Sequence, residues 1–328
     1  SLDKARKGGA YEQIPSLVLG QRWTPQLNSR NMMKVVLCVW IEPYIENDLS
    51  FCVWPVHTPT TSKEVLTLSA STSPLPYTGN KSCIVNTILS VMPKHTVYID
   101  PCMGSAKVFF RKPRAEKEIL NDYNGDLVNL FRVIQNNEKL AYLLGRLYLS
   151  INGELAFKQN KDRLKGVPNI LDDVIETSQI FYDASWEDIQ NAAAFLENQV
   201  YSFSSTGQTF GIARRDMSQR LPRLMSAYNR IRDAIILHRD YKDVITYAAC
   251  PGSFILLDPP YKGTEDMYSK ANFDIEQHDI LFSFMSEVNQ QHHGEVKFLI
   301  TYNNDPYIRG LAEKHGFDTF VQTRLHSM

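Results

Sequence analysis

Residues 96–106, Thr-Val-Tyr-Ile-Asp-Pro-Cys-Met-Gly-Ser-Ala, give the clearest indication of the fold. The apolar run Thr96–Asp100 predicts a short strand that ends in an acid, and the small residues after it predict a tight turn and a helix start. Small residues in such a turn let a cofactor approach the backbone, as in nucleotide-binding turns. Ala106 stands at the third small position, where glycine is more usual.

Four more short apolar runs predict strands, and helical patterns lie between them: Glu118–Leu120, Ala234–Leu237, Phe254–Leu257 and Lys297–Thr301. This alternation is typical of a largely parallel α/β sheet with crossover helices. Residues 152–234 interrupt it with a polar, mainly helical segment that breaks at Phe203–Gly211. We therefore expect an inserted second domain in this part of the chain.

Residues 1–70 contain no motif with a recognisable chemical role. Two runs within them, Val35–Ile41 and Phe51–Val56, have the composition of strands. The segment fits an extra subdomain, an extension of the sheet, or a lead-in without regular structure.

The composition is that of a globular protein, with 328 residues of which 43% are hydrophobic and 22% are charged. Lysine plus arginine number 35 and aspartate plus glutamate 36, so any surface for nucleic acid must be a local patch. The five cysteines form no CxxC pair, which suggests neither a disulfide framework nor a metal site. No apolar run is long enough for a membrane span, and the N-terminus does not resemble a secretion signal. We expect a cytoplasmic protein with reduced cysteines, no metal and no membrane partner.

The strongest chemical signal is Asp258-Pro259-Pro260-Tyr261, directly after the apolar run Ser253–Leu257. Ligands of open parallel sheets bind beyond the carboxyl ends of the strands. The prolines fix φ, so the Asp258 carboxylate and the Pro259 carbonyl become two acceptors beside an aromatic face. Such a site suits a planar aromatic amine, because the acceptors stabilise the positive charge that builds on nitrogen during attack. The alternative is a turn that begins a helix.

Asp122 ends the predicted strand that follows Asp100 in the chain. An acid in this position can hold the two hydroxyl groups of a ribose. The alternative is that Asp122 caps the helix whose pattern includes Leu127.

Two weaker segments contain an aromatic residue beside a charged one. Residues 76–82, Pro-Tyr-Thr-Gly-Asn-Lys-Ser, carry Tyr77 and Lys81, which can engage a carboxylate and a sulfonium by ion pairing and cation–π contact. Asp240 and Tyr241 follow a predicted strand and can bind and stack on an adenine ring. A surface turn and a solvent-exposed loop are the respective alternatives.

Residues 204–239 hold two aspartates, no lysine or glutamate, and seven arginines: Arg214, Arg215, Arg220, Arg223, Arg230, Arg232 and Arg239. Arginine suits bidentate contacts to phosphate and guanine. A polar and aromatic loop, residues 201–211, lies just before most of them, and aromatic residues beside arginines favour nucleic acid over a small ligand. The alternative is a solvated helix face.

Taken in order, five segments resemble those of the Dam-type (alpha-class) N6-adenine DNA methyltransferases, which use S-adenosylmethionine: PYTGNKS, IDPCMGSAKVFF, ILNDYNGDLVNLF, HRDYKDV and LLDPPYKG. The resemblance covers about residues 74–328. It implies a Rossmann-like α/β fold with a mostly parallel seven-stranded sheet and an inserted, mainly helical target-recognition domain. It also implies site-specific methyl transfer to the N6 amine of an adenine flipped out of double-stranded DNA.

The resemblance assigns roles to individual residues of this chain. Catalysis at the flipped base falls to Asp258, Pro259, Pro260 and Tyr261. Cofactor contacts fall to Tyr77, Lys81, Asp100, Pro101, Gly104, Asp122, Tyr123, Asp240, Tyr241 and Asp258. Residues 198–211 resemble the loop that carries DNA contacts in phage-like relatives, so DNA contacts are expected at Ser204 and, from the local composition, at Arg214, Arg215, Arg220 and Arg223.

The expected domains are an N-terminal extension (1–70), a catalytic domain (71–137 and 235–328) and a target-recognition insertion (138–234). Ala106 departs from the family pattern and is expected to lower cofactor affinity. Family members also continue into a last strand, whereas this sequence stops at Met328. The run Glu64–Leu68 can supply a strand at that edge instead.

Two other functions remain open at this point. An RNA or ribosomal RNA base amino-methyltransferase can carry the same Asp258–Tyr261 loop, and a catalytically degenerate relative can retain DNA binding alone. The resemblance also suggests a restriction endonuclease as a partner and association with the bacterial or phage nucleoid. The recognition sequence and the oligomeric state do not follow from the sequence.

Overall fold

The computed structural model describes residues 33–41, 73–77, 84–172, 184–212, 215–264 and 273–325. Several expectations therefore lie outside the described residues: Lys81, Arg214, the possible strand Phe51–Val56 and the possible edge strand Glu64–Leu68. Among the described helices, none has both the length and the apolar character needed to cross a membrane.

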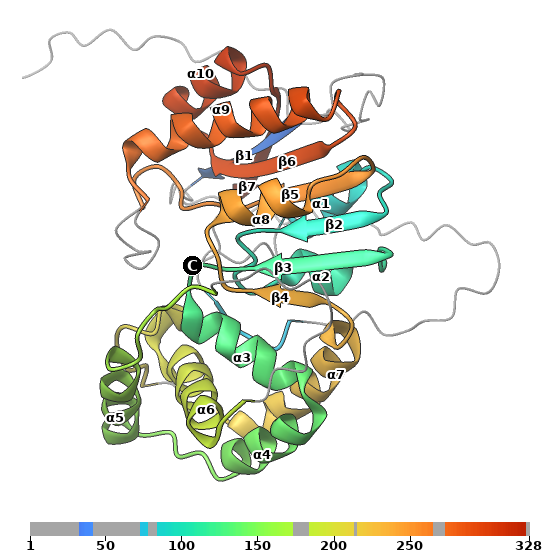
Figure 1. Ribbon diagram of the computed structural model, residues 1–328. Helices are drawn as coiled ribbons and strands as arrows, with labels where there is room; N and C mark the ends of the chain where they lie inside the picture. The colour runs from blue at the N-terminus through green and yellow to red at the C-terminus, as the bar shows by residue number, and fades with distance from the viewer. Residues whose placement is uncertain are drawn as a thin grey trace, which may run out of the picture. The chain divides into compact units, whose positions relative to one another are not determined.

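A seven-stranded sheet forms the centre of the described chain, in the order β4-β3-β2-β5-β6-β1-β7 (Figure 1). Its strands are β1 (Met33–Ile41), β2 (Val97–Asp100), β3 (Lys117–Asn121), β4 (Ile235–Leu237), β5 (Ser253–Leu257), β6 (Lys297–Asn303) and β7 (Asp318–Leu325). Each neighbouring pair is parallel. The strand order reverses direction between β2 and β5, which is where doubly wound sheets bind ligands. The predicted fold class is confirmed.

The N-terminal segment contributes β1, which lies between β6 and β7. Val35 pairs with Ile300 on one side and with Thr319 on the other. Thus residues 33–41 extend the sheet, one of the three options that the sequence left open. The other segment expected near this edge, Glu64–Leu68, lies outside the described residues, and β7 is a strand that the sequence pattern did not indicate.

Alternate residues of the buried strands point to opposite faces of the sheet, as the two-residue repeat of a strand requires. Val36, Tyr98 and Leu120 face one hydrophobic cluster, whereas Val35 and Ile99 face another. The first cluster is covered by α1 (Val85–Val91), α2 (Lys107–Arg111) and α3 (Gly125–Gln135). The second is covered by α8 (Tyr241–Ala248), α9 (Ile275–Gln291) and α10 (Pro306–Lys314).

The inserted region is helical, as predicted, and gathers beside edge strand β4 in Figure 1. It consists of α4 (Asn137–Tyr148), α5 (Glu154–Lys165), α6 (Trp186–Tyr201), two short 3-10 helices (Phe203–Ser205 and Met217–Arg220) and α7 (Leu221–Ile231). Helix α6 begins with a reciprocal capping box between Ser185 and Asp188, and every residue from Asn191 to Tyr201 is buried. These helices share the first hydrophobic cluster with the sheet.

A buried ion cluster joins α7 to the sheet. The Glu118 carboxylate on β3 accepts hydrogen bonds from Lys112 Nζ at 2.5 Å and from two Arg230 nitrogens at 2.5 and 2.8 Å. Burial raises the pKa of Glu118, but the bonds from Arg230 and Lys112 outweigh it and hold the pKa below its usual value. Arg230 is only 8% exposed, so it does not belong to a basic surface as its sequence neighbourhood suggested.

Candidate active site

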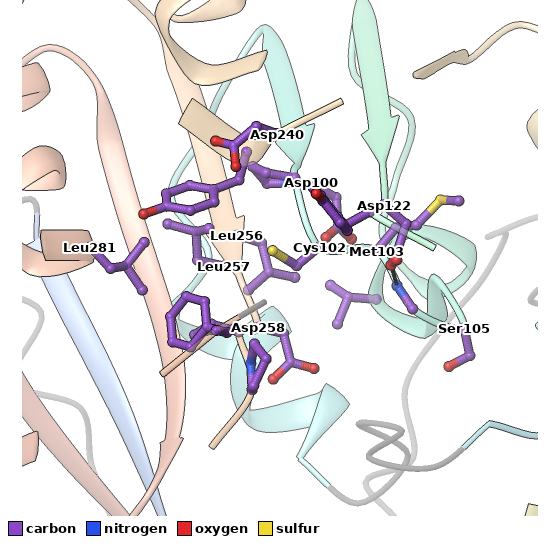
Figure 2. Close-up of a pocket in the computed structure, with 18 of the residues that line it drawn as sticks. Asp100, Cys102, Met103, Ser105, Asp122, Asp240, Leu256, Leu257, Asp258 and Leu281 are labelled. Atoms are coloured by element: carbon purple, nitrogen blue, oxygen red, sulfur yellow. Dashed lines mark hydrogen bonds between the residues drawn. The ribbon is translucent and has the colours of Figure 1, made fainter. Parts of the chain in front are cut away.

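Four aspartates meet around one cavity because each follows a strand of the parallel sheet. Asp100 ends β2, Asp122 follows β3, Asp240 follows β4 and Asp258 follows β5. Figure 2 shows these four side chains around the cavity. Their proximity is also visible at the buried thiol of Cys102, whose pKa is raised well above its usual value first by burial and then by all four carboxylates.

Most of the residues predicted to act together do line this cavity: Tyr77, Asp100, Pro101, Gly104, Asp122, Tyr123, Asp240, Tyr241, Asp258, Pro259 and Pro260. Sequence reasoning missed one wall, which is formed by Gln277 and Leu281 of α9 and by Phe273 just before this helix. Gln277 and Leu281 are four residues apart, which is the repeat of one helix face. That spacing could have marked them as a group, but not as neighbours of Asp258.

The turn after β2 is held in place by its own backbone and by β3. Gly104 adopts a left-handed conformation with φ of 48°, and its N–H donates to Asp122 Oδ2 at 2.9 Å. Ala106 is also left-handed, with φ of 52°, at the N-cap of α2. Its methyl group is buried in the hydrophobic core and does not line the cavity. The Ala106 departure thus falls on backbone geometry rather than on the shape of the cavity.

The Asp122 carboxylate accepts hydrogen bonds from backbone N–H groups and does not cap a helix. Its two carboxylate oxygens accept from Gly104 N and from Asn124 N, both at 2.9 Å. Asn124 is the N-cap of α3, so the structure does not support the capping alternative. Burial raises the pKa of Asp122 to about 6, against the lowering effect of the backbone hydrogen bonds, and the Asp258 charge raises it further.

Asp240 and Tyr241 form the wall between β4 and α8. Asp240 caps α8 by accepting from Lys242 N at 2.9 Å. The Tyr241 ring meets Phe284 edge to face, and its buried hydroxyl has no hydrogen-bond partner among the described residues. Burial, then Asp240 and Cys102, raise the pKa of Tyr241 far above its ordinary range. An unpaired buried hydroxyl beside a cavity favours a polar group of a bound ligand.

The loop after β5 divides its residues between the cavity and a neighbouring aromatic cluster. Asp258, Pro259 and Pro260 line the cavity, whereas Tyr261 is not among its lining residues. The Tyr261 ring lies 5.9 Å from the ring of Tyr302 on β6. Asp258 Oδ1 accepts a hydrogen bond from the hydroxyl of Thr301, also on β6, at 2.7 Å.

A basic cluster connects the cavity to the insertion. Lys107 lines the cavity, and its pKa is lowered first by burial and then by the charge of Arg223. Arg215, Arg220 and Arg223 line a shallow polar pocket together with Asp216 and Gln219. Burial and the two neighbouring arginines lower the pKa of Arg220. Like charges gathered in this way favour an anionic partner.

The loop before this cluster is tightly folded. Ser202 and Phe210 form an antiparallel bridge, and Ser204 between them has φ of 52°. The Arg215 guanidinium donates to the backbone carbonyls of Val200 and Ser202, which ties the loop to the basic cluster. Ser204 and Arg215 therefore lie on one connected structure.

The charged and polar groups of the cavity fit those of S-adenosylmethionine. The cofactor carries a sulfonium cation, a ribose and an adenine. The four carboxylates that line the cavity carry the charge opposite to that of the sulfonium. Asp122 lies at a strand end, where a carboxylate can accept from ribose hydroxyls, and Tyr241 offers an aromatic ring with an unpaired hydroxyl for the adenine. No rearrangement of the described residues is needed to bring these groups together.

Comparison with known proteins places these features in a family. The model of the D12 class N6 adenine-specific DNA methyltransferases matches residues 77–328. The chain is similar to the DNA N-6-adenine-methyltransferase of Escherichia phage P1, at 25% identity over 74% of this chain and 31% of that protein. It is also similar to the modification methylase StsI of Streptococcus sanguinis, at 25% identity over 70% of this chain and 35% of that protein.

A third relative is the type II methyltransferase M.CviBI of Paramecium bursaria Chlorella virus NC1A, at 22% identity over 70% of this chain and 79% of that protein. The chain spans about a third of the length of the phage P1 and Streptococcus relatives.

Proposed function

Because this chain belongs to the D12 class of N6 adenine-specific DNA methyltransferases, we propose that it transfers a methyl group from S-adenosylmethionine to the N6 amine of an adenine flipped out of duplex DNA. One observation carries the proposal. The Asp258-Pro259-Pro260 loop opens into the same cavity as the Gly104 turn and Asp122. An amine acceptor and a nucleoside-binding wall thus share one site.

The chain's own residues bind and orient the cofactor. Asp122 accepts from the ribose hydroxyls, and Asp240 with Tyr241 holds the adenine. Asp100, Pro101, Gly104 and Tyr123 surround the turn, and Tyr77 with Lys81 meets the methionine end. When bound, S-adenosylmethionine supplies an electrophilic methyl group.

Asp258 and the carbonyl of Pro259 hold the target amine. They would accept its two hydrogens and so hold the nitrogen lone pair free for attack. The amine would take the methyl group from the bound cofactor, which leaves as a thioether, and would then release one of its protons to solvent. Tyr261 stacks on the flipped base, and Pro260 keeps the loop rigid.

The insertion recognises DNA in this proposal. Arg214, Arg215, Arg220 and Arg223 contact phosphates or bases, and the loop at Ser204 enters a groove. Residues 138–234 form the target-recognition part, and residues 71–137 and 235–328 form the catalytic part. A restriction endonuclease partner and action in the cytoplasm, on nucleoid DNA, follow from the same proposal.

The test is transfer of tritium from labelled S-adenosylmethionine to unmethylated mixed-sequence duplex DNA, followed by nucleoside analysis. We expect label in N6-methyladenine. Asp258→Ala should abolish transfer while binding of S-adenosylhomocysteine, measured by calorimetry, survives. Glu287→Ala is the matched control, because Glu287 is exposed on α9, outside the cavity lining, and accepts a hydrogen bond from Ser283 of its own helix at 3.0 Å.

The outcome separates the alternatives. Label in structured RNA but not in DNA would replace DNA by RNA as the substrate. DNA binding without label and without cofactor binding would indicate a degenerate relative. Full activity of Asp258→Ala would exclude Asp258 as the amine acceptor.

A further inference from the structure

The carboxyl end of β6 braces the whole loop that follows β5. Three consecutive residues of β6 each contact it. Thr301 donates to the Asp258 carboxylate, the Tyr302 ring lies against the Tyr261 ring, and Asn303 Nδ2 donates to the Lys262 carbonyl at 3.0 Å. The two strands are hydrogen-bonded neighbours in the sheet, so these contacts rest on a rigid element.

The Thr301 hydroxyl is placed to act on the Asp258 carboxylate. It lies 2.7 Å from Asp258 Oδ1 and 3.4 Å from the carbonyl of Leu257, so its single proton is committed to the carboxylate. Thr301 is fully buried, which removes competition from water. Threonine is also branched at Cβ, so its side chain is stiff at χ1 and defines the direction of the bond.

Tyr302, the next residue of β6, is held by contacts of its own. The Tyr302 ring stacks on Phe282 with an interplanar angle of 17°, and its hydroxyl lies 2.8 Å from Nδ1 of the buried His278. Both partners belong to α9, the helix that supplies the missed wall of the cavity. Helix α9 therefore holds the carboxyl end of β6 in place, so Thr301 does not move readily when the Asp258 carboxylate moves.

We propose that Thr301 is a positioning residue, which orients the carboxylate of Asp258 to accept the amine of the target base. This rests on the function proposed above, since Asp258 is the group that touches the base. Thr301 itself lies outside the cavity lining and touches no substrate. Removal of its hydroxyl takes away the contact from β6 that orients the carboxylate, and the reacting amine then meets an acceptor in a less favourable direction.

The test compares Thr301→Val, which keeps the shape and the branching, with Thr301→Ser, which keeps the hydroxyl. Thr301→Val should lower kcat about 10- to 100-fold, as expected for loss of a hydrogen bond to a charged group. The KM for DNA and the Kd for S-adenosylhomocysteine should change less than about threefold, and Thr301→Ser should keep kcat within about threefold. Thr319→Val, at an exposed threonine of β7, is the control.

A merely structural role predicts a different pattern. In that case Thr301→Ser, which loses a buried methyl group, would be damaged as much as Thr301→Val, or kcat would follow the fall in melting temperature. Either result, or an unchanged kcat in Thr301→Val, overturns the proposal.

A second measurement does not depend on activity. In a thermal-unfolding cycle, Thr301→Val combined with Asp258→Ala should lose about as much stability as the worse single variant, because the two groups share one interaction. Additive losses overturn the assignment. If the wild-type chain methylates nothing, the proposed function fails, while this cycle still decides whether Thr301 holds Asp258.

Discussion

Replacing Glu118 by glutamine should destabilise the chain by about 3 kcal/mol, which is large for a change of one atom type. The Glu118 carboxylate receives four N–H donors, two from Arg230 and one each from Lys112 and the backbone of Ala115. An amide keeps one acceptor oxygen and turns an NH2 group toward these cations. The Lys112 side chain is 0% exposed and that of Arg230 is 8% exposed, so two buried charges lose their counter-ion.

Removing one partner of a buried ion pair typically costs about 3–5 kcal/mol. The lower end applies here, because both cations keep other favourable contacts. Lys112 Nζ lies 4.3 Å from the centre of the Tyr98 ring, and the Arg230 guanidinium lies 3.7 Å from that of Phe109; such contacts are worth about 2 kcal/mol each when desolvated. At about 2–4 °C per kcal/mol, the melting temperature should fall by roughly 6–12 °C.

The assay is thermal unfolding by circular dichroism between pH 3 and pH 8, with Glu154→Gln as the control. Glu154 also pairs with a lysine, but both side chains are about two-thirds exposed, so its loss should be near 0.3–0.5 kcal/mol. The pKa of Glu118 is lowered in the folded chain. Its contribution is therefore complete above the unfolded value near 4.3 and is lost as the pH falls through the folded value.

The difference between wild type and Glu118→Gln should thus shrink at the acid end of this range. A loss no larger than that of the control, or one that is constant down to pH 3, would show that the buried cluster does not stabilise the fold as argued.

Three further predictions concern the site. With its pKa of about 6, Asp122 is mostly ionised at pH 7 and mostly protonated at pH 5, so the Kd for S-adenosylhomocysteine should rise roughly tenfold as the pH falls from 7 to 5. Asp122→Asn should flatten the dependence of this Kd on pH, measured by calorimetry, and an equally steep dependence in the variant would contradict the assignment. Ala106→Gly relieves the strain of a left-handed alanine, which is worth about 1–2 kcal/mol. It also costs about 0.5–1 kcal/mol of additional backbone entropy on folding and about 0.8 kcal/mol for the buried methyl group, so the free energy of unfolding in urea should stay within about 1 kcal/mol of wild type. A change beyond about 2 kcal/mol in either direction would be inconsistent with this balance. Arg223→Ala should reduce the slope of log K against log salt for DNA binding by about 0.9, whereas the exposed Arg111→Ala on α2 should leave it unchanged; equal slopes for both variants would remove Arg223 from the DNA interface.

Much of the candidate site could be read from local pattern. The pattern predicts that the acids after Ile99, Asn121 and Leu257 lie at one edge of the sheet, because the carboxyl ends of parallel strands meet at one edge. The structure confirms that these acids share a cavity. Their roles toward cofactor and base remain predictions, and Lys81 and Arg214 lie outside the described residues.

Charge counted along the chain was a poorer guide than strand ends. Arg223 is exposed, whereas Arg230, two turns further along the same helix, is buried against Glu118. A helix turns about 100° per residue, so residues seven apart lie on nearly the same face, and the difference comes from what packs against each end of α7. Which of these arginines is available to DNA depends on which turn of α7 packs on the sheet.

Local sequence was sufficient for the alternation of strands and helices, the acids at the strand ends and the Asp258–Tyr261 loop, because these depend on periodicity and on turn chemistry within a few residues. Three features became apparent only in the folded chain: residues 33–41 enter the sheet between β6 and β7, α9 closes the cavity, and Thr301 meets Asp258 across 43 residues of chain. Such contacts arise from the packing of segments far apart in the sequence, where local pattern carries no information about the partner.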